Sequence, residues 1–413
     1  MKLKDTSYTA EEIMALTDKY LMETYERFDF MAESASEMYL YDETGRAFLD
    51  FYGGVAVNSV GNSNQRVVSA IIDQAQDLSH TFNYPYTIPQ ALLAKTICEA
   101  IKMDKIFFQN SGTEANEAMI KLARKYGTDH FGPNKFQIIT ATNSFHGRTF
   151  GSLSATGQPD SANQLGYLPG VPGFSYVPFN DLKAIKESYN ENVIGIMLEP
   201  IQGEGGVNPA ELEYLQGVRN FCDEKNILLL LDEVQTGWGR TGELMAYMHY
   251  DIRPDIVSMA KAMGGGTPIG AICATKKVAT AFSHGAHGST FGGSPLCCAA
   301  SLAAVSEIIE RNLAINAHLV GKDFMAKLTD LPGVKEVRGR GLMIGIEFKD
   351  PIAYDVKHHA FDHRLLVTAI GEHTVRLVPP LIATVEDCNE ALAILMESSH
   401  TALEKLEEKR KSA

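Results

Sequence analysis

The sequence predicts an α/β fold, with a mostly parallel central sheet covered by helices and a smaller second domain. Between residues 105 and 275, strand-like runs alternate with amphipathic helical stretches, a pattern typical of a parallel sheet with helices on both faces. The runs end in polar or glycine-rich turns, and ligands of open α/β sheets bind beyond the carboxyl ends of the strands. The 413 residues, 45% of them hydrophobic, suffice for a large core and two domains.

Six strands are predicted in this central part. In order, they are the runs KIFFQN, FQIITAT, VIGIMLEP, ILLLLDEV, DIVSMAK and IGAICAT. The polar turns among them are NSGTEAN, TNSFHGRT, EPIQGEGG and DEVQTGWGRTG. Because the carboxyl ends of parallel strands meet at one edge of a sheet, we expect these turns to gather around one site.

The flanking segments indicate a smaller domain. Near the N-terminus, MYLYDETGRAFLDFYGG alternates like a hairpin but is too short to bury a core alone. Residues 299–331 have a largely helical pattern, and GLMIGIEF and HTVRLVPP follow as strands. We expect a large domain over residues 66–310 and a small α+β domain over residues 311–413, with residues 1–65 packing on the small domain.

Composition and charge limit the possible partners. The net charge of −14 argues against nucleic acid or an anionic membrane, because phosphate binding needs clustered Lys and Arg. The six cysteines show no CxxC spacing, which favours a reducing compartment. The N-terminus lacks the apolar stretch of a signal peptide, and no segment approaches the roughly 18 apolar residues of a membrane span. We expect a cytoplasmic protein.

The segment SGTEANEAMIKLAR predicts a helix that starts near Ser111. Ser111 and Glu114 have the spacing of a capping box. Gly112 lets a ligand approach the backbone, so the free N–H groups at this helix start could bind a phosphate. Taken alone, the same pattern also fits an ordinary helix cap.

Asp232 and Glu233 directly follow a run of four leucines. A buried carboxylate is costly unless a cation or hydrogen-bond donors meet it. Lys261 follows the next apolar strand and precedes three glycines, an unusual place for a lysine. A desolvated amine there is a candidate Schiff-base nucleophile, and the alternative is a lysine that reaches the surface at a strand end.

Together, these three features fit the needs of pyridoxal phosphate. The helix start would bind the phosphate, and Lys261 would bind the cofactor covalently. A carboxylate beside the pyridine nitrogen keeps that nitrogen protonated, so that the ring withdraws electrons from the reacting carbon. Asp232 would be this partner, which leaves a structural role for Glu233.

Seven segments resemble, in order, those of the class III aminotransferases. They are NSGTEANEAMIKLAR, FHGRT, EPIQGEGG, LDEVQTGWGRTG, AKAMGGGTPIGA, STFGGSPL and VRLVPPL. The resemblance covers nearly the whole chain, and it implies a pyridoxal-phosphate-dependent transferase of fold type I. Two segments depart from the family pattern, namely Ser294 in place of Asn and VGNSNQ at residues 60–65.

The resemblance also implies roles for individual residues. Lys261 would bind the cofactor and later move a proton, and Asp232 would face the pyridine nitrogen. Thr290 would reach across a homodimer interface to the neighbouring subunit's cofactor phosphate, so that a monomer would be inactive. The remaining cofactor-binding residues implied are Ser111, Gly112 and Thr113 at the phosphate, Phe145 and Val234 on the ring faces, and Gln235 near the phenolic oxygen.

Three charged residues are implied in substrate binding. Arg376 would bind the α-carboxylate of glutamate or 2-oxoglutarate, and a structural ion pair is the alternative for this residue. Arg148 would bind the distal carboxylate of an ω-amino donor. Glu204, between glycines, would neutralise Arg376 while that donor is bound and then swing away.

The segments SFHGRT, EPIQGEGGV and HRLLVTAIGEHTVRLVPPLIAT are most similar to those of family members that act on N-acetylornithine. The expected reaction therefore moves the δ-amino group of N-acetylornithine to 2-oxoglutarate, in arginine biosynthesis. Succinylornithine, ornithine and 4-aminobutyrate are alternative donors. A second alternative is a non-catalytic α/β binding or scaffold protein with inherited motifs.

Two further patterns predict no site. His359 and His363 are four residues apart in a possible helix, but no third ligand or HExxH pattern accompanies them, so no metal site is predicted. GRGLMIG lacks the GxGxxG spacing and precedes a strand, so dinucleotide binding is not predicted.

Overall fold

The computed structural model describes residues 1–167 and 169–412. Its centre is a seven-stranded sheet with the order β4-β12-β11-β10-β7-β5-β6. The strands are β4 (Lys105–Gln109), β5 (Gln137–Ala141), β6 (Phe174–Val177), β7 (Val193–Leu198), β10 (Leu228–Asp232), β11 (Ile256–Met259) and β12 (Gly270–Ala274). All six predicted strands are present.

The central sheet is mostly parallel, as predicted, with one exception. Strand β12 runs antiparallel to both of its neighbours, β11 and β4, whereas β10 runs parallel to β7 and β11, and β5 runs parallel to β6 and β7. Strand β6 was not predicted. It lies at the sheet edge and is only partly buried, so its sequence carries a weaker apolar signal.

Helices cover both faces of this sheet, and the four leucines of β10 show why the strand is apolar throughout. Leu228 and Leu230 belong to an apolar cluster that includes the buried face of α5 (Gly112–Phe131). Leu229 and Leu231 belong to the main core together with residues of α8 (Leu212–Lys225). Because strand side chains alternate between faces, a strand covered on both sides is apolar at every position.

The first strands of the chain join a sheet near its C-terminal end. The order of this sheet is β1-β2-β3-β15, with β1 (Ala32–Ser36), β2 (Tyr39–Asp42), β3 (Ala47–Asp50) and β15 (Leu365–Leu366). Strands β2 and β3 form the predicted hairpin, whose turn contains Gly45 at φ +85°. Strand β15 pairs in parallel with β3, so this sheet combines residues from both ends of the chain.

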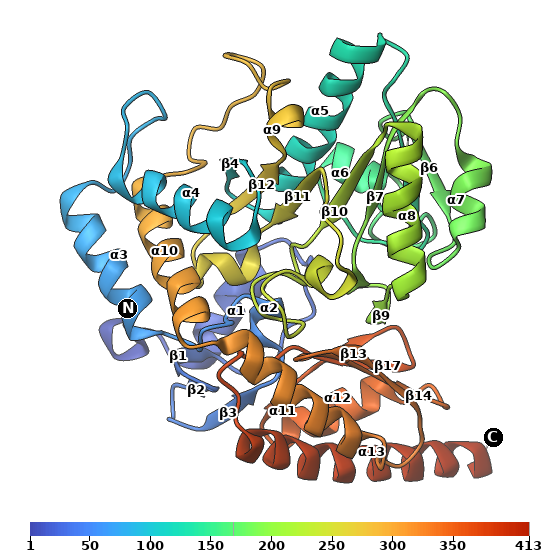
Figure 1. Cartoon of the computed structure of the whole chain (residues 1–413). Coiled ribbons are helices and arrows are strands. Elements are labelled where there is room, and N and C mark those ends of the chain that lie inside the picture. Colours follow the sequence, from blue (N-terminus) through green and yellow to red (C-terminus); the bar gives the residue numbers. More distant parts are fainter. Residues whose placement is uncertain (168, 413) are drawn as a thin grey trace.

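A third sheet, of order β13-β14-β17-β16, is antiparallel and lies with helices α11, α12 and α13 at the bottom of Figure 1. Its strands are β13 (Val334–Arg340), β14 (Met343–Phe348), β16 (Thr368–Ile370) and β17 (Thr374–Leu377). The predicted helical stretch consists of α10 (Pro295–Glu310) and α11 (Leu313–Leu328), and α12 (Ala353–Asp362) and α13 (Val385–Ser412) follow later. The domain boundaries at residues 65 and 310 stay a prediction.

Further helices and strands complete the described part of the chain. They are η1 (Leu3–Asp5), α1 (Ala10–Tyr20), α2 (Gly53–Ala56), α3 (Gln65–Asp77), α4 (Ile88–Ile101), α6 (Phe150–Ala155), α7 (Leu182–Ser188), β8 (Ile201–Gln202), β9 (Asn208–Pro209), η2 (Ala246–Tyr250), η3 (Lys261–Gly264) and α9 (Lys276–Ala279). In residues 1–167 and 169–412, no helix is both long and apolar enough to cross a membrane.

The unusual segment VGNSNQ leads into α3. The side chain of Asn64 accepts hydrogen bonds from the backbone N–H groups of Arg66 and Val67 at 3.0 and 3.3 Å. Asn64 is therefore the N-cap of α3, a position where asparagine is among the preferred residues. This departure from the family pattern thus has a local structural role. Ser294 is likewise the N-cap residue of α10, but its side chain makes no capping hydrogen bond.

Candidate active site

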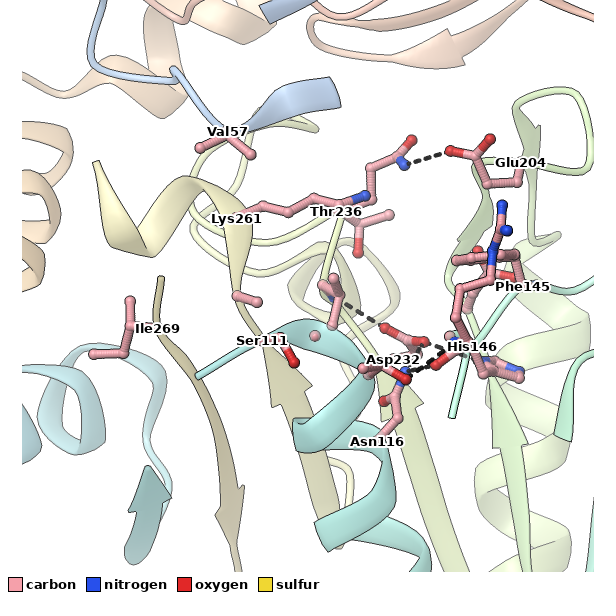
Figure 2. A pocket seen from close by; sticks show the side chains of 18 of the residues that line it. Val57, Ser111, Asn116, Phe145, His146, Glu204, Asp232, Thr236, Lys261 and Ile269 are labelled. Carbon is pink, nitrogen blue, oxygen red and sulfur yellow. Dashed lines mark hydrogen bonds and ion pairs between the residues drawn. The ribbon is translucent and has the colours of Figure 1, made fainter. Parts of the chain in front are cut away.

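A cavity of about 330 Å³ lies at the edge of the central sheet where its parallel strands end. Figure 2 shows most of the side chains that line it. Ten residues predicted from the sequence contribute to this lining, namely Ser111, Gly112, Thr113, Phe145, Arg148, Glu204, Asp232, Val234, Gln235 and Lys261. The predicted gathering of the polar turns at one sheet edge is therefore confirmed.

Asp232 ends β10 at the bottom of this cavity and is almost fully buried. Its Oδ2 atom accepts hydrogen bonds from Asn116 Nδ2 at 2.7 Å and from His146 Nδ1 at 2.8 Å. Its Oδ1 atom accepts one from the backbone N–H of Val234 at 3.0 Å. These three donors compensate the cost of burying the carboxylate and fix its orientation.

Asn116 and His146 are site residues that were not predicted from the sequence. Asn116 lies in the second turn of α5, where a polar residue ordinarily faces solvent, and yet it is buried. Its side chain also accepts a hydrogen bond from Ser258 Oγ at 2.6 Å. The segment FHGRT carries part of the family resemblance, but nothing in its spacing indicates that the imidazole of His146 meets a carboxylate from a strand far along the chain.

Glu199 is a further buried acid that was not predicted. Its carboxylate accepts hydrogen bonds from the backbone N–H groups of Phe145 at 3.0 Å and Gly203 at 3.2 Å. Burial raises the pKa of Glu199 to about 7, and Asp232 adds to this rise while His146 opposes it. Glu199 thereby ties the turn that carries Phe145 to the loop that carries Glu204.

Lys261 follows β11 and begins the short helix η3. Its backbone has φ +47°, a left-handed conformation that costs free energy for a residue with a side chain and is often found at functional sites. Burial lowers the pKa of its amine, and the charge of Arg376 lowers it further, while Glu204 and Asp232 raise it. A larger fraction of the amine is therefore neutral and nucleophilic.

Helix α5 begins at the cavity, as predicted. Ser111 is its N-cap and accepts a hydrogen bond from the backbone N–H of Glu114 at 3.2 Å. The capping box differs in one detail, because the Glu114 carboxylate accepts from the backbone N–H of Asn110 rather than of Ser111. A Cβ atom at Gly112 would lie 2.6 Å from Cγ1 of Val234, so this close contact requires glycine.

The Thr113 hydroxyl oxygen accepts hydrogen bonds from the backbone N–H groups of Arg148 and Thr149 at 3.1 and 3.3 Å. The helix start and the FHGRT turn are thus joined directly. Arg148 is exposed, and its guanidinium lies 5.6 Å from the centre of the Phe145 ring.

Arg376 in β17 lies behind Glu204 and does not line the cavity. Its side chain is 4% exposed, and its Nη1 atom lies 2.5 Å from Oε1 of Glu204. Glu204 Oε1 also accepts a hydrogen bond from Gln235 Nε2 at 3.3 Å. Burial raises the pKa of Glu204, but the charges of Arg376 and Lys261 outweigh burial, and the net pKa is lowered.

Thr290 and Glu233, two residues considered in the sequence, do not line this cavity. Thr290 is exposed in the loop after α9, away from the cavity of its own chain. Glu233 points away from the site and accepts hydrogen bonds from the Thr236 hydroxyl at 2.6 Å and from the backbone N–H groups of Ala246 and Tyr247 at 2.9 and 2.7 Å. This bonding at the start of η2 is the structural role expected for Glu233.

Comparison with known proteins agrees with this geometry. The family model of the class-III aminotransferases matches residues 20–398. The chain is 46% identical to the acetylornithine aminotransferase of Caldanaerobacter subterraneus over 91% of this chain and 96% of the relative. It is 44% identical to the acetylornithine aminotransferase of Methanocaldococcus jannaschii over 94% and 98% of the two chains. The crystal structure of ornithine aminotransferase from Toxoplasma gondii superposes with a TM-score of 0.92 at 31% identity, covering 97% of each chain. The chain therefore belongs to the class-III aminotransferases.

Proposed function

We propose that the cavity binds pyridoxal 5′-phosphate, and the donor set fits this cofactor. The start of α5 offers backbone N–H groups to a phosphate, and the contact between Gly112 and Val234 leaves no room for a side chain there. Asp232, oriented by three donors, suits a protonated pyridine nitrogen. Lys261 supplies the amine for the covalent bond. Phe145 and Val234 would contact the ring faces, and Gln235 the phenolic oxygen.

When bound, the cofactor withdraws electrons from the carbon that carries the transferred amino group. Lys261 then has two tasks in the proposed mechanism. Its amine would hold the cofactor covalently, and the same amine would move a proton at the reacting carbon of the substrate. Asp232 would lie beside the ring nitrogen, and the hydrogen bonds from His146 and Asn116 would keep it in place.

The substrate reaction we propose is transfer of the δ-amino group of N-acetylornithine to 2-oxoglutarate, which gives N-acetylglutamate semialdehyde and glutamate. The names of the two curated relatives support this donor. Arg376 would bind the α-carboxylate of glutamate or 2-oxoglutarate, and Arg148 the distal carboxylate of the donor. One site serving two substrates in turn predicts ping-pong kinetics.

The pair formed by Glu204 and Arg376 is the observation that carries the proposal. An arginine buried in this way would otherwise leave an unpaired charge beside the uncharged segment of an ω-amino donor. While Glu204 pairs with Arg376, this side of the cavity carries no net charge. When Glu204 turns away, Arg376 is free to bind a carboxylate through two hydrogen bonds. A site with two such states suits an enzyme that binds an ω-amine and an α-amino acid alternately.

Steady-state rates with a small panel of donors test the substrate. We expect the highest kcat/KM for N-acetylornithine, with N-succinylornithine, ornithine and 4-aminobutyrate below it, when 2-oxoglutarate is the acceptor. A higher value for ornithine or 4-aminobutyrate would overturn the proposed donor. Purified protein that neither binds the cofactor nor reacts with any of the four donors would support the non-catalytic alternative.

A homodimer is part of the same proposal, with Thr290 contributing to the neighbouring subunit's phosphate site. The loop of Thr290 is held beside residues 82–92, because Asn83 Nδ2 donates to the carbonyl of Gly292 at 2.9 Å and Gln90 Nε2 to that of Gly293 at 3.1 Å. This region exposes several large apolar side chains, namely Phe82, Tyr84, Tyr86, Ile88, Leu92 and Phe291. Such a patch is typical of a protein interface.

We also propose that the enzyme is cytoplasmic.

A further inference from the structure

The structure brings a third potential ligand to the histidine pair of α12. His359 lies near the end of α12 and His363 directly after it, and Glu397 belongs to the neighbouring helix α13. One ring nitrogen of each histidine and one carboxylate oxygen of Glu397 all lie within 4.8 Å of one another. No local sequence pattern indicates this carboxylate, because Glu397 approaches only through the packing of the two helices.

The hydrogen bonds of His363 fix its tautomer. Its Nδ1 atom lies 2.9 Å from the backbone carbonyl oxygen of His359. Because a carbonyl can only accept, Nδ1 carries the hydrogen and donates it. The Nε2 atom of the neutral ring therefore keeps its lone pair, and it lies 3.7 Å from Oε1 of Glu397.

The tautomer of His359 is fixed in a similar way. Its Nδ1 atom lies 3.0 Å from Oγ of Ser398. The Ser398 hydroxyl donates its only hydrogen to the carbonyl oxygen of Ile394 at 2.7 Å, so Oγ must accept from His359 Nδ1. Both rings thus present an unprotonated Nε2, each with its other nitrogen bonded to protein, which is the usual arrangement of histidines that bind a metal.

The two imidazole rings lie against each other. They stack with 4.3 Å between their centres and an angle of 22° between their planes, and a rotation of the rings brings both Nε2 lone pairs toward one ion. Two imidazoles and one carboxylate are a ligand set known for Zn²⁺ with an open fourth position, whereas Ca²⁺ and Mg²⁺ prefer oxygen ligands alone. Bonds of about 2.0–2.2 Å place tetrahedral ligand atoms about 3.4 Å apart, which rotation of the exposed side chains of His363 and Glu397 toward the half-buried His359 can reach.

We propose that His359, His363 and Glu397 form a binding site for a divalent transition metal, Zn²⁺ in particular, that clamps α12 to α13. None of the three residues lines the active-site cavity, so the ion stabilises the packing of the two helices and takes no part in amino transfer. A ligand that binds only the folded chain raises its stability by mass action.

Zinc titration of the untagged, cofactor-loaded protein after chelator treatment tests the site. We expect one Zn²⁺ per chain by calorimetry and a higher unfolding temperature with ZnCl₂ but not with MgCl₂. His363→Ala should abolish both effects, and Glu397→Gln should weaken zinc binding about tenfold or more. Both variants should keep the aminotransferase rate.

His400→Ala is the matched control. His400 is an exposed histidine of α13, the helix that carries Glu397. Its Nε2 atom lies 3.2 Å from Oε1 of Glu404, and this pair includes no second histidine. This variant should bind zinc like the wild type. The proposal is overturned if the wild type binds no zinc, if His363→Ala or Glu397→Gln binds as tightly as the wild type, or if His400→Ala loses binding as well.

Discussion

At the residue scale, Lys261 combines a left-handed backbone with a desolvated amine whose pKa is lowered. We expect Lys261→Ala to lose at least about 10³-fold in turnover and to lose the visible absorbance of the covalently bound cofactor, while circular dichroism stays unchanged. Lys276→Ala, which removes an exposed lysine beyond β12, is the control. Retained turnover together with a normal spectrum would refute the role of Lys261.

Asp232 is the second residue whose role can be isolated. Asp232→Asn removes the charge but keeps the size of the side chain, so the cofactor should stay bound while proton abstraction slows by several orders of magnitude. Single-turnover absorbance changes with glutamate measure this step. A variant within about tenfold of the wild type would mean that the charge beside the ring nitrogen is dispensable.

The sequence predicted most residues of the site but not their supports. Asp232 and Lys261 were identifiable because a charged residue directly after an apolar strand is unusual and points to a partner at the strand end. Asn116, His146 and Glu199 were not, because their burial depends on elements that meet only in the folded chain. The pairing of Glu204 with Arg376 was implied by the family resemblance, but the place of Arg376 outside the cavity lining follows from the packing of β17 against the loop after β7.

At the element scale, Glu233 joins the end of β10 to the start of η2. Burial raises its pKa to about 7, although hydrogen bonds from Thr236, Ala246 and Tyr247 oppose the rise. A carboxyl group whose pKa is higher in the folded state binds more protons there than in the unfolded state. Its contribution to stability is therefore complete below about pH 4.5 and falls as the pH rises toward 7.

The side chain introduced by Glu233→Gln resembles the protonated carboxyl group of Glu233, and it does not titrate. We expect this variant to be less stable than the wild type at pH 5 by about 1–3 kcal/mol, since its amide cannot accept from all three donors. The difference should shrink as the pH rises to 7.5. Urea unfolding of both proteins at several pH values measures it, and a difference that grows with pH would contradict the assignment.

The loop after β7 carries the proposed gate. Glu204→Gln should leave Arg376 available to an α-carboxylate, so the half-reaction with glutamate should gain about tenfold relative to that with N-acetylornithine. Single-turnover absorbance changes of the cofactor measure each half-reaction separately. Glu211→Gln, at the exposed N-cap of α8, should leave the ratio unchanged. If Glu204→Gln slows both half-reactions equally, or only that of glutamate, Glu204 is a structural partner.

Strands and helices were predictable to different degrees. The six strands of the central sheet were recognised because each is apolar and bounded by turn residues. The sequence did not reveal that β12 is antiparallel, because a strand buried on both faces looks the same in either direction. Strand β6 was missed, since an edge strand needs few apolar residues.

At the scale of the whole molecule, the proposed dimer places Thr290 at another subunit's phosphate. Thr290→Ala should weaken cofactor binding by about 10- to 100-fold, which is the effect expected from the loss of one hydrogen bond to a charged group. The sedimentation coefficient of the protein should stay unchanged. Equilibrium titration with pyridoxal phosphate measures this loss. Unaltered cofactor affinity would remove Thr290 from the site.

Heterodimers of Lys261→Ala and Thr290→Ala subunits test the composite site more directly. If Thr290 acts across the interface, one of the two sites in the heterodimer combines an intact lysine with an intact threonine. At limiting cofactor, such heterodimers should regain about half of the wild-type activity. No recovery would indicate that both residues act within one chain.

The parallel pairing of β3 with β15 also affects the order in which the parts of the chain can fold during its synthesis. The strands of the central sheet lie within residues 105–274, so they can pair while the rest of the chain is still on the ribosome. The hairpin of β2 and β3 leaves the ribosome earlier, yet its partner strand at Leu365–Leu366 is made only after nearly the whole chain. Until then β3 has an open edge, the kind of surface that pairs with other nascent chains. A sheet whose first strands are made early is therefore completed late, and a chain that ends before residue 365 keeps the edge of β3 exposed.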